Sequence, residues 1–429
     1  MGVREQAQEK PWWWEAAPLS EPNPDLPSSR VDVAIVGAGF TGLSAALTLG
    51  KAGLSVLVLD ADRPGAGASS RNGGMVGYLL KPGLGGLIAA YGEDKAKAVY
   101  AEALQSVAFL KDRVQEEGID CDLALSGRLY PAVLPKHLEA MAREAERRKT
   151  LLGTSEDVVS ADACRDDVKS DLYVGGVRQL GTGGLHPAKY VKGMVSAVLA
   201  HNVRISAPNR VLAVHRRRQG FELVTEAGVV QADQVLLATN GYSGPVFPFL
   251  QRRVIPVGST MIATEPLPEE QVRALFPTGR MITDSRKMLS YYRPSPDGRR
   301  VLLGGRPTVL PASPARQADA LRRRLVEIFP ELAGTGISHV WSGKVAYDFE
   351  ALPTIGRQEG IWYALGYCGS GVAMSGYLGH KAALKILGHA DGQTAFDDLP
   401  FPTRPWYRGT PWFLPFAMAG YQMRDRLRF

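Results

Sequence analysis

The sequence is poor in cysteine. Its three cysteines, Cys121, Cys164 and Cys368, lie far apart and form no CxxC pair. An odd, scattered set supplies neither a disulfide framework nor the clustered ligands of a structural zinc site. We therefore expect a protein of a reducing compartment, the cytoplasm, that holds no metal.

Long apolar runs are also missing. The richest candidate, residues 31–59, is broken by glycines and a lysine, so no stretch reaches the roughly 20 apolar residues of a membrane-spanning helix. The first residues are charged and lead to Pro11 and the tryptophans Trp12–Trp14, which do not resemble the apolar core of a signal peptide. We expect no membrane span.

A strong charge of one sign is absent too. Lys and Arg number 50 and Asp and Glu 43, which gives a net charge of +7. Apart from the run Arg216–Arg218 the basic residues are scattered, so they do not predict a nucleic-acid-binding face. We expect a small-molecule partner and no nucleic acid.

The sequence does contain a strand–helix–strand pattern near its start. β-branched apolar residues fill 31–36, helix-forming residues fill 40–49, and a second apolar run fills 54–59. This pattern is typical of a βαβ unit in a parallel sheet. Apolar strands around 203–241 continue it, whereas the runs between 253 and 304 alternate like an antiparallel sheet.

A chain of 429 residues is too long for one small core. We predict an α/β fold (α+β overall) with a Rossmann-like nucleotide-binding domain and an inserted antiparallel-sheet substrate domain. The predicted division is an N-terminal arm (1–30), a discontinuous nucleotide-binding domain (31–90, 150–245 and 345–395), a substrate or cap domain (91–149 and 246–344) and a C-terminal tail (396–429).

The first strand runs into a G-x-G-x-x-G fingerprint. Gly37 permits the tight turn, Gly39 lets a pyrophosphate approach the backbone, and Gly42 lets the helix lie close to the strand. Asp60 ends the second strand, where a carboxylate accepts hydrogen bonds from a ribose. Strand, fingerprint, helix, strand and acid in this order predict a dinucleotide site.

Two further glycine-rich segments follow strands. Residues 64–74 form a loop with many backbone donors and little side-chain bulk, and residues 366–371 precede a helix. A helix N-terminus there would stabilise negative charge on a reduced ring system. The alternative is that both segments are ordinary flexible turns.

These segments resemble the D-amino-acid oxidase (glycine/sarcosine oxidase) superfamily of FAD-dependent oxidoreductases. The likeness rests on residues 37–42, Asp60 and 67–74, and also on 238–242, 297–306 and 366–371. Within the superfamily the chain is most similar to the gamma-glutamylputrescine oxidoreductase group.

The resemblance implies an FAD enzyme that takes a hydride from the carbon beside an amine nitrogen onto flavin N5, giving an imine. It implies that FAD is held by Gly37, Ala38, Gly39, Phe40, Thr41, Gly42, Asp60, Ala61, Ala68, Ser69, Ser70, Arg71, Asn72, Gly73, Gly74, Met75, Val211, Thr239, Asn240, Gly241, Gly369, Ser370, Gly371, Val372, Ala373 and Met374.

The sequence departs from the family at the places where FAD is attached covalently. Members that tether FAD use a His in the loop after the second strand or a Cys after a Trp-x-Gly. Asn72 stands at the first place and Val345–Ala346 at the second. We expect FAD to be bound without a covalent link.

The basic residue that holds an α-carboxylate in amino-acid oxidases is also missing from its usual places, Val345–Ala346 and Val372–Ala373. This favours a primary or secondary amine over an α-amino acid, although Arg306 or Lys344 could act as a relocated clamp. Aromatic faces can hold a cationic amine. We therefore expect the substrate pocket to contain Tyr292, Arg306, Tyr347 and Tyr367.

Other functions stay open on the sequence alone. An amino-acid oxidase of the glycine, sarcosine or D-amino-acid type and a non-catalytic flavin-binding partner subunit are both compatible with the motifs. A flavin reductase that uses NAD(P)H normally needs a second nucleotide fingerprint, and none follows another predicted strand. Leu302 stands near the place of an oxygen-activating Lys, so oxidase and dehydrogenase are not distinguished.

Overall fold

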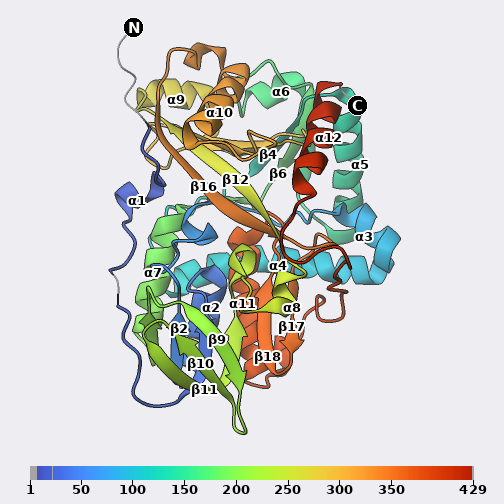
Figure 1. Ribbon diagram of the computed structural model, residues 1–429. Coiled ribbons are helices and arrows are strands. Elements are labelled where there is room, and N and C mark those ends of the chain that lie inside the picture. Colours follow the sequence, from blue (N-terminus) through green and yellow to red (C-terminus); the bar gives the residue numbers. More distant parts are fainter. Residues whose placement is uncertain (1–6, 22, 428–429) are drawn as a thin grey trace.

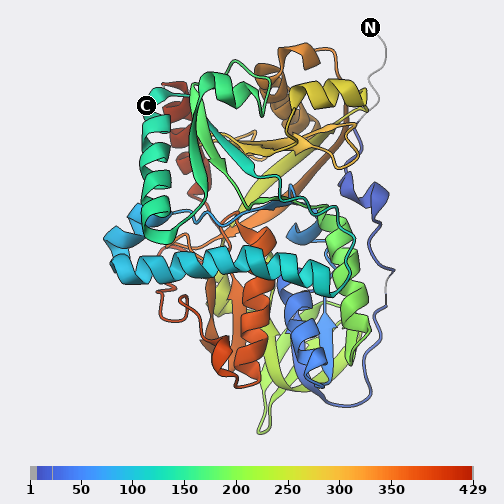
Figure 2. The same ribbon diagram turned by 180° about the vertical axis from the view of Figure 1, so that it is seen from behind.

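The structure is a computed structural model that describes residues 7–21 and 23–427. Two eight-stranded sheets dominate it, and a small pair, β3 (Met75–Val76) and β7 (Gly183–Gly184), lies apart from them. One large sheet fills the lower half of the molecule and the other the upper half, each with its own helices (Figure 1). The long helix α4 (Glu93–Glu116) crosses the middle, between the two halves (Figure 2).

The lower sheet has a parallel centre. Apolar residues fill β1 completely apart from Asp32, and most are fully buried, as expected for a strand covered on both faces. The neighbours β18, β11, β1, β2 and β8 all run parallel. The strands are β1 (Val31–Val36), β2 (Val56–Leu59), β8 (Val203–Ser206), β9 (Val211–Arg216), β10 (Phe221–Thr225), β11 (Gly228–Leu237), β17 (Thr354–Gln358) and β18 (Ile361–Leu365).

Two helices pack on each other against one face of this sheet (Figure 2). α2 (Phe40–Lys51) follows β1, and α11 (Gly371–Ile386) follows β18. Gly379 brings their backbones together, because a Cβ at this position would lie 2.2 Å from the carbonyl oxygen of Thr41. Because α2 follows β1 and α11 follows β18, both helices begin at the carboxyl ends of parallel strands, where α/β sheets bind ligands.

The upper sheet is antiparallel except for one parallel pair, β4 with β13. Its two longest strands, β12 and β16, run side by side from the upper half into the middle of the molecule (Figure 1). The strands are β4 (Arg128–Ala132), β5 (Glu156–Ser160), β6 (Gly175–Gln179), β12 (Ile255–Thr264), β13 (Met281–Thr283), β14 (Ser290–Pro294), β15 (Val301–Gly305) and β16 (Ile337–Tyr347).

The remaining helices cover the outside. Among them α9 and α10 lie over the upper sheet, and α12 lies beside α5 in both views (Figures 1 and 2). They are α1 (Trp13–Ala16), α3 (Gly83–Tyr91), α5 (Pro135–Leu152), α6 (Ala161–Arg165), α7 (Pro187–Leu199), α8 (Pro248–Gln251), α9 (Glu269–Leu275), α10 (Pro314–Ile328) and α12 (Leu414–Arg426), with short 3-10 turns η1 (Ala68–Ser70), η2 (Asn240–Tyr242), η3 (Pro330–Leu332) and η4 (Ala390–Gly392).

The predicted mixed fold is confirmed, with one correction to its division. We expected residues 150–245 to belong to the nucleotide-binding domain, but β5 and β6 pair with β4 in the upper sheet. The nucleotide-binding part of this segment therefore begins after β6.

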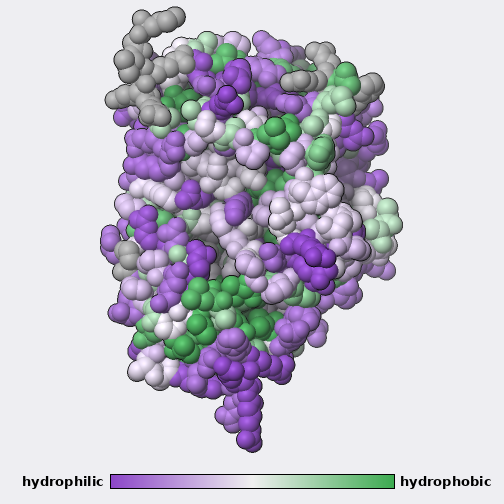
Figure 3. Space-filling view, viewed as in Figure 1, coloured by the Kyte–Doolittle hydropathy of each residue, from purple (hydrophilic) through white to green (hydrophobic). Residues whose placement is uncertain are grey.

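Polar residues dominate the face seen in Figure 3, with an apolar group in its lower half over β9, β10 and β11. Leu212 and Val229, both about half exposed, belong to these strands. Among the described residues no helix is long and apolar enough to cross a membrane.

Candidate cofactor and substrate site

A cavity of about 1010 Å³ opens where β1, β2 and β11 end. The N-terminal turns of α2 and α11 contribute to its wall through Phe40, Thr41, Gly371 and Val372. Its volume is at the upper end of what small-molecule sites occupy. A helix N-terminus presents unpaired backbone N–H groups, so this cavity suits a ligand with negative charge at more than one place.

The fingerprint glycines stand where no side chain fits. Gly37 has φ +111°, and a Cβ there would lie 2.7 Å from the carbonyl oxygen of Ala238. A Cβ on Gly42 would lie 1.9 Å from the oxygen of Gly37, so this glycine lets α2 press against the turn. Gly39 lines the cavity, and a Cβ there would meet the hydroxyl of Ser69 at 2.8 Å.

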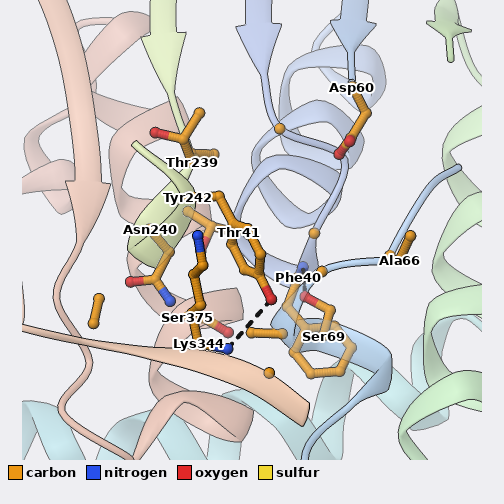
Figure 4. A pocket seen from close by; sticks show the side chains of 18 of the residues that line it. Phe40, Thr41, Asp60, Ala66, Ser69, Thr239, Asn240, Tyr242, Lys344 and Ser375 are labelled. Atoms are coloured by element: carbon orange, nitrogen blue, oxygen red, sulfur yellow. Dashed lines mark hydrogen bonds between the residues drawn. The ribbon is translucent and has the colours of Figure 1, made fainter. Parts of the chain in front are cut away.

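Asp60 lies at the end of β2 and points toward this turn (Figure 4). Its carboxylate accepts hydrogen bonds from the backbone N–H of Ala38 at 2.6 Å and of Asp62 at 3.0 Å. Burial raises the pKa of Asp60 to about 6, because the charged form loses water. A ribose hydroxyl donating to this carboxylate would favour the charged form again.

The loop after β2 is held by its own side chains. The backbone N–H of Phe40 donates to Ser69 Oγ at 3.0 Å, which joins the loop to the start of α2. Asn72 Nδ2 donates to the carbonyl oxygens of Ala68 (3.0 Å) and Ser69 (2.9 Å), and Asn72 Oδ1 accepts from Gly74 N at 2.7 Å. Asn72 therefore has a structural task within this loop, where the resemblance led us to look for a tethering His.

Three tryptophans hold the same loop from outside. The indole N–H groups of Trp13 and Trp341 donate to the carbonyl oxygens of Asn72 and Arg71, each at 2.9 Å. Trp14 Nε1 donates to the hydroxyl of Ser70, also at 2.9 Å. The N-terminal arm thus reaches across to the loop, which fixes the position of the cavity wall.

The structure brings most of the predicted cofactor residues together. Those that line the large cavity are Gly37, Gly39, Phe40, Thr41, Asp60, Ala61, Ala68, Ser69, Arg71, Asn72, Val211, Thr239, Asn240, Gly369, Gly371 and Val372. Gly73, Met75 and Ser370 line only the neighbouring cavity described below. Ala38, Gly42, Ser70, Gly74, Gly241, Ala373 and Met374 line neither cavity and support the wall from behind.

Several lining residues were not predicted. Tyr242 stands beside Asn240, and Lys344 lies across the cavity from Ser69 and Phe40 (Figure 4). The backbone N–H of Lys344 donates to Tyr242 Oη at 3.3 Å, and Lys344 Nζ lies 5.2 Å from the Tyr242 ring centroid. Tyr367 and Lys344, which were expected near the substrate, also line this cavity. The other lining residues outside the predicted cofactor set are Val36, Leu59, Asp62, Gly65–Gly67, Asn209, Arg210, Ala238, Tyr242, Gly244–Phe247, Gly258, Ser342, Gly343, Val345, Ala346, Cys368 and Ser375.

A second cavity of about 320 Å³ adjoins the first. The same three segments contribute to both cavities: the loop after β2, strand β16 and the turn before α11. The residues that line both are Ala68, Arg71, Asn72, Gly343, Lys344, Val345, Cys368, Gly369 and Val372.

The four predicted substrate residues do not all lie in one cavity. Arg306 and Tyr347 line the second cavity, and Arg306 Nη2 donates to Tyr347 Oη at 2.9 Å. Tyr367 lines the large cavity, where its hydroxyl lies 2.7 Å from Thr41 Oγ1. Tyr292 is a correction: it is fully buried in the core of the upper half, and its hydroxyl lies 2.6 Å from that of Tyr173.

Tyr291 takes the place expected for Tyr292. It lines the second cavity, and its hydroxyl lies 2.9 Å from Ser259 Oγ. Adjacent residues of a strand point to opposite faces, so only one of the two tyrosines can reach the cavity. Leu302, on the neighbouring strand, packs beside Trp13 and Trp341.

Other chemistry is limited. Cys368 lines both cavities, and burial raises the pKa of its thiol far above the ordinary value, which keeps the sulfur protonated. No group of three or more His, Cys, Asp or Glu side chains within the described residues is placed to hold a metal ion.

Known proteins are similar to this chain in sequence and in fold. The DAO family model, described as FAD dependent oxidoreductase, matches residues 32–384. The chain is 32% identical over 409 residues to a gamma-glutamylputrescine oxidoreductase from Escherichia coli (strain K12), and this match covers 93% of the chain and 94% of the relative. It is 27% identical over 370 residues to a glycine oxidase from Pseudomonas putida, covering 80% and 91%.

The crystal structure of glycine oxidase from Geobacillus kaustophilus matches with a TM-score of 0.74 at 21% identity, and covers 88% of this chain and 99% of that one. An agreement of this size at low identity shows a common fold. The predicted resemblance and the predicted cofactor, FAD, are confirmed. The chain belongs to the DAO family of FAD-dependent oxidoreductases, enzymes that act on amines and amino acids.

Proposed function

We propose that this chain oxidises a C–N bond of a primary or secondary amine to an imine, with FAD in the large cavity and the amine in the second. The observation that carries the proposal is the wall that both cavities share, built from the loop after β2, the end of β16 and the turn before α11. A ring system lying at this wall is within reach of a molecule in the second cavity. Bound FAD would supply the acceptor for a hydride from the carbon beside the nitrogen.

The geometry supports a proposed set of contacts for FAD. Gly39 and the first turn of α2 would meet the pyrophosphate, and Asp60 the ribose of the adenosine half. The start of α11, at Gly371 and Val372, would lie near the flavin and would stabilise negative charge there. Asn72 already satisfies its polar atoms within the loop, which supports non-covalent binding.

The chain's role toward the substrate is to bind and orient it. Among the described residues, those lining the second cavity include no Asp or Glu that could act there as a general base. A base is not required if the amine binds uncharged. The positive side chains around the cavity favour that form, because a nearby positive charge lowers the pKa of an ammonium group.

The relatives' names support an amine or amino-acid substrate: one is a gamma-glutamylputrescine oxidoreductase and another a glycine oxidase. The second candidate function is an amino-acid oxidase. It is favoured by Arg306, which lines the second cavity and is held by Tyr347, and which is able to pair with an α-carboxylate.

Anaerobic stopped-flow bleaching of the flavin separates the two candidates. We expect simple amines and amines without an α-carboxylate to reduce the flavin faster than glycine, sarcosine or D-alanine. The reason is that a carboxylate buried without a positive partner costs several kcal/mol, and the usual clamp positions beside the flavin carry none. If sarcosine or D-alanine outpaces every such amine, and Arg306→Ala abolishes that preference, the chain is an amino-acid oxidase.

A further inference from the structure

The charged side chains that line the second cavity are all positive. Among the described residues that form its wall, six are basic and none is acidic. These residues are Arg71, Lys81, Arg128, Lys287, Arg306 and Lys344.

None of the six forms an ion pair with a carboxylate in the described part of the chain. Arg128 donates to Thr283 Oγ1 at 2.8 Å, and Arg71 Nε donates to the carbonyl oxygen of Ala66 at 2.7 Å. Arg306 has the hydroxyl of Tyr347, which is a neutral partner. Positive groups that converge without counter-charges repel each other, so the arrangement raises the free energy of the empty cavity.

Three of them, Lys81, Lys287 and Arg306, line the second cavity together. Partial burial, and then repulsion by Arg306 and Lys287, lowers the pKa of the Lys81 ammonium. Lys81 and Lys287 are nevertheless exposed residues. The groups are therefore close enough to feel each other and open enough to receive a ligand.

The cluster lies away from the proposed flavin. Lys81, Lys287 and Arg306 line only the second cavity, whereas the wall shared with the large cavity contains Arg71 and Lys344. The three therefore do not serve the phosphates or the flavin of the cofactor. They come from segments far apart in the chain: the turn before α3, the loop between β13 and β14, and the residue after β15.

The Arg306 side chain and the backbone that carries Lys287 are held in position by their surroundings. Tyr347 accepts from Arg306 Nη2 and lies with its ring 5.2 Å from the guanidinium carbon. The backbone N–H groups of Lys287 and Met288 donate to the carboxylate of Asp425 on α12, at 2.9 and 2.7 Å. α12 therefore fixes the loop that carries Lys287.

We propose that Lys81, Lys287 and Arg306 form a distal anion subsite that binds a carboxylate on the substrate, several bonds from the nitrogen that is oxidised. The proposal rests on the proposed function, because the reacting nitrogen is placed at the shared wall. The substrate is then an amine with an acidic far end. A free diamine carries a second ammonium group, which the cluster repels.

Binding tests the subsite without turnover. The holoprotein is titrated with glutarate, which has no nitrogen to oxidise, and with the uncharged glutaramide, by calorimetry and by the change in the flavin spectrum. We expect glutarate to bind and glutaramide not to bind. Arg306→Gln and Lys287→Gln should each weaken glutarate by about tenfold to a hundredfold, the usual loss for one charged hydrogen-bond partner. Lys111→Gln, on the exposed face of α4, is the matched control and should change nothing.

Kinetics then tests the position of the anion. Anaerobic flavin reduction is compared for an ω-amino acid, an n-alkylamine and an α,ω-diamine of equal chain length. We expect the ω-amino acid to bind most tightly, and Arg306→Gln to raise its Kd by a much larger factor than that of the n-alkylamine. Thermal unfolding shows that each variant is folded.

Equal binding of glutarate and glutaramide overturns the subsite, and so do equal affinities for the three amines. The proposed function stands in either case if the amines bleach the flavin. Preference for an α-amino acid of the same size also overturns it, since the cluster then acts beside the reacting carbon. Tighter competition by inorganic phosphate than by glutarate overturns the assignment to carboxylate. If glutarate binds through Arg306 but no amine bleaches the flavin, the subsite holds and the proposed function fails.

Discussion

The contact between α2 and α11 yields a paired prediction, because two glycines one turn apart on α11 meet different surroundings. A Cβ on Gly379 would lie 2.2 Å from the carbonyl oxygen of Thr41, and real Cβ atoms essentially never come within 3.0 Å. A Cβ on Gly376 would meet nothing nearer than the Tyr190 hydroxyl at 3.8 Å. Gly379→Ala therefore forces the helices apart, and Gly376→Ala does not.

The magnitude follows from two effects. Each Gly→Ala change in a helix interior gains about 1 kcal/mol of helix propensity. Overpacking costs about 1–3 kcal/mol, and a rigid backbone oxygen places Gly379→Ala at the upper end of this range. The difference between the variants isolates the overpacking cost, so we expect Gly379→Ala to be less stable than Gly376→Ala by about 2–3 kcal/mol.

Urea unfolding of the two apoproteins measures this difference. FAD affinity, from the quenching of flavin fluorescence, should fall for Gly379→Ala because Thr41 lines the cofactor cavity and its hydroxyl bonds to Tyr367. Gly376→Ala should bind FAD like the unmodified protein. Equal unfolding free energies, or unchanged FAD affinity in Gly379→Ala, would refute the close packing that we describe.

Three further predictions concern the cofactor. Acid precipitation should release all flavin into the supernatant, because no tether is expected; colour kept in the unfolded pellet would contradict this. FAD affinity should weaken as pH falls through about 6, because Asp60 must be ionised to accept fully from the ribose and its pKa in the free protein is about 6. This pH dependence should disappear in Asp60→Asn. If it persists, another group titrates. Trp13→Phe removes the donor to Asn72 O and should cost about 1–3 kcal/mol in unfolding free energy with weaker FAD binding; unchanged values would show that the arm does not hold the loop.

The parallel half of the fold was predictable because its signals are local. The run at 31–36, the glycines up to Gly42 and the acid at Asp60 lie within one βαβ unit, where spacing along the chain fixes geometry. The helices Glu93–Glu116 and Pro187–Leu199 likewise show their periodicity within one continuous segment each. Each helix has an apolar stripe that is buried by packing against a neighbouring sheet or helix.

The upper sheet was harder to predict because its strands depend on distant partners. β16 was not expected, although its residues 342–346 line the large cavity, because its pattern mixes polar and apolar residues and its pairing partner, β12, lies far back in the chain. The choice of Tyr292 over Tyr291 failed for a related reason: a shift of one residue in a strand exchanges the two faces.

Of the cluster of Lys81, Lys287 and Arg306, only Arg306 was expected in the substrate pocket, and the two lysines come from separate segments that carry no motif. Only the tertiary structure shows that the three share a wall, on which the described residues include no carboxylate. The family to which the chain belongs fixes the cofactor, whereas we propose that these side chains select the substrate.

The most direct test of the central claim is anaerobic reduction of the bound flavin by an ω-amino acid and by the same compound deuterated at the carbon beside the nitrogen. We predict that the visible flavin absorbance bleaches with both, and more slowly with the deuterated compound, because the C–H bond at that carbon is broken as the flavin is reduced. Absence of bleaching with every amine, or bleaching at the same rate with both isotopologues under single-turnover conditions, would contradict the account.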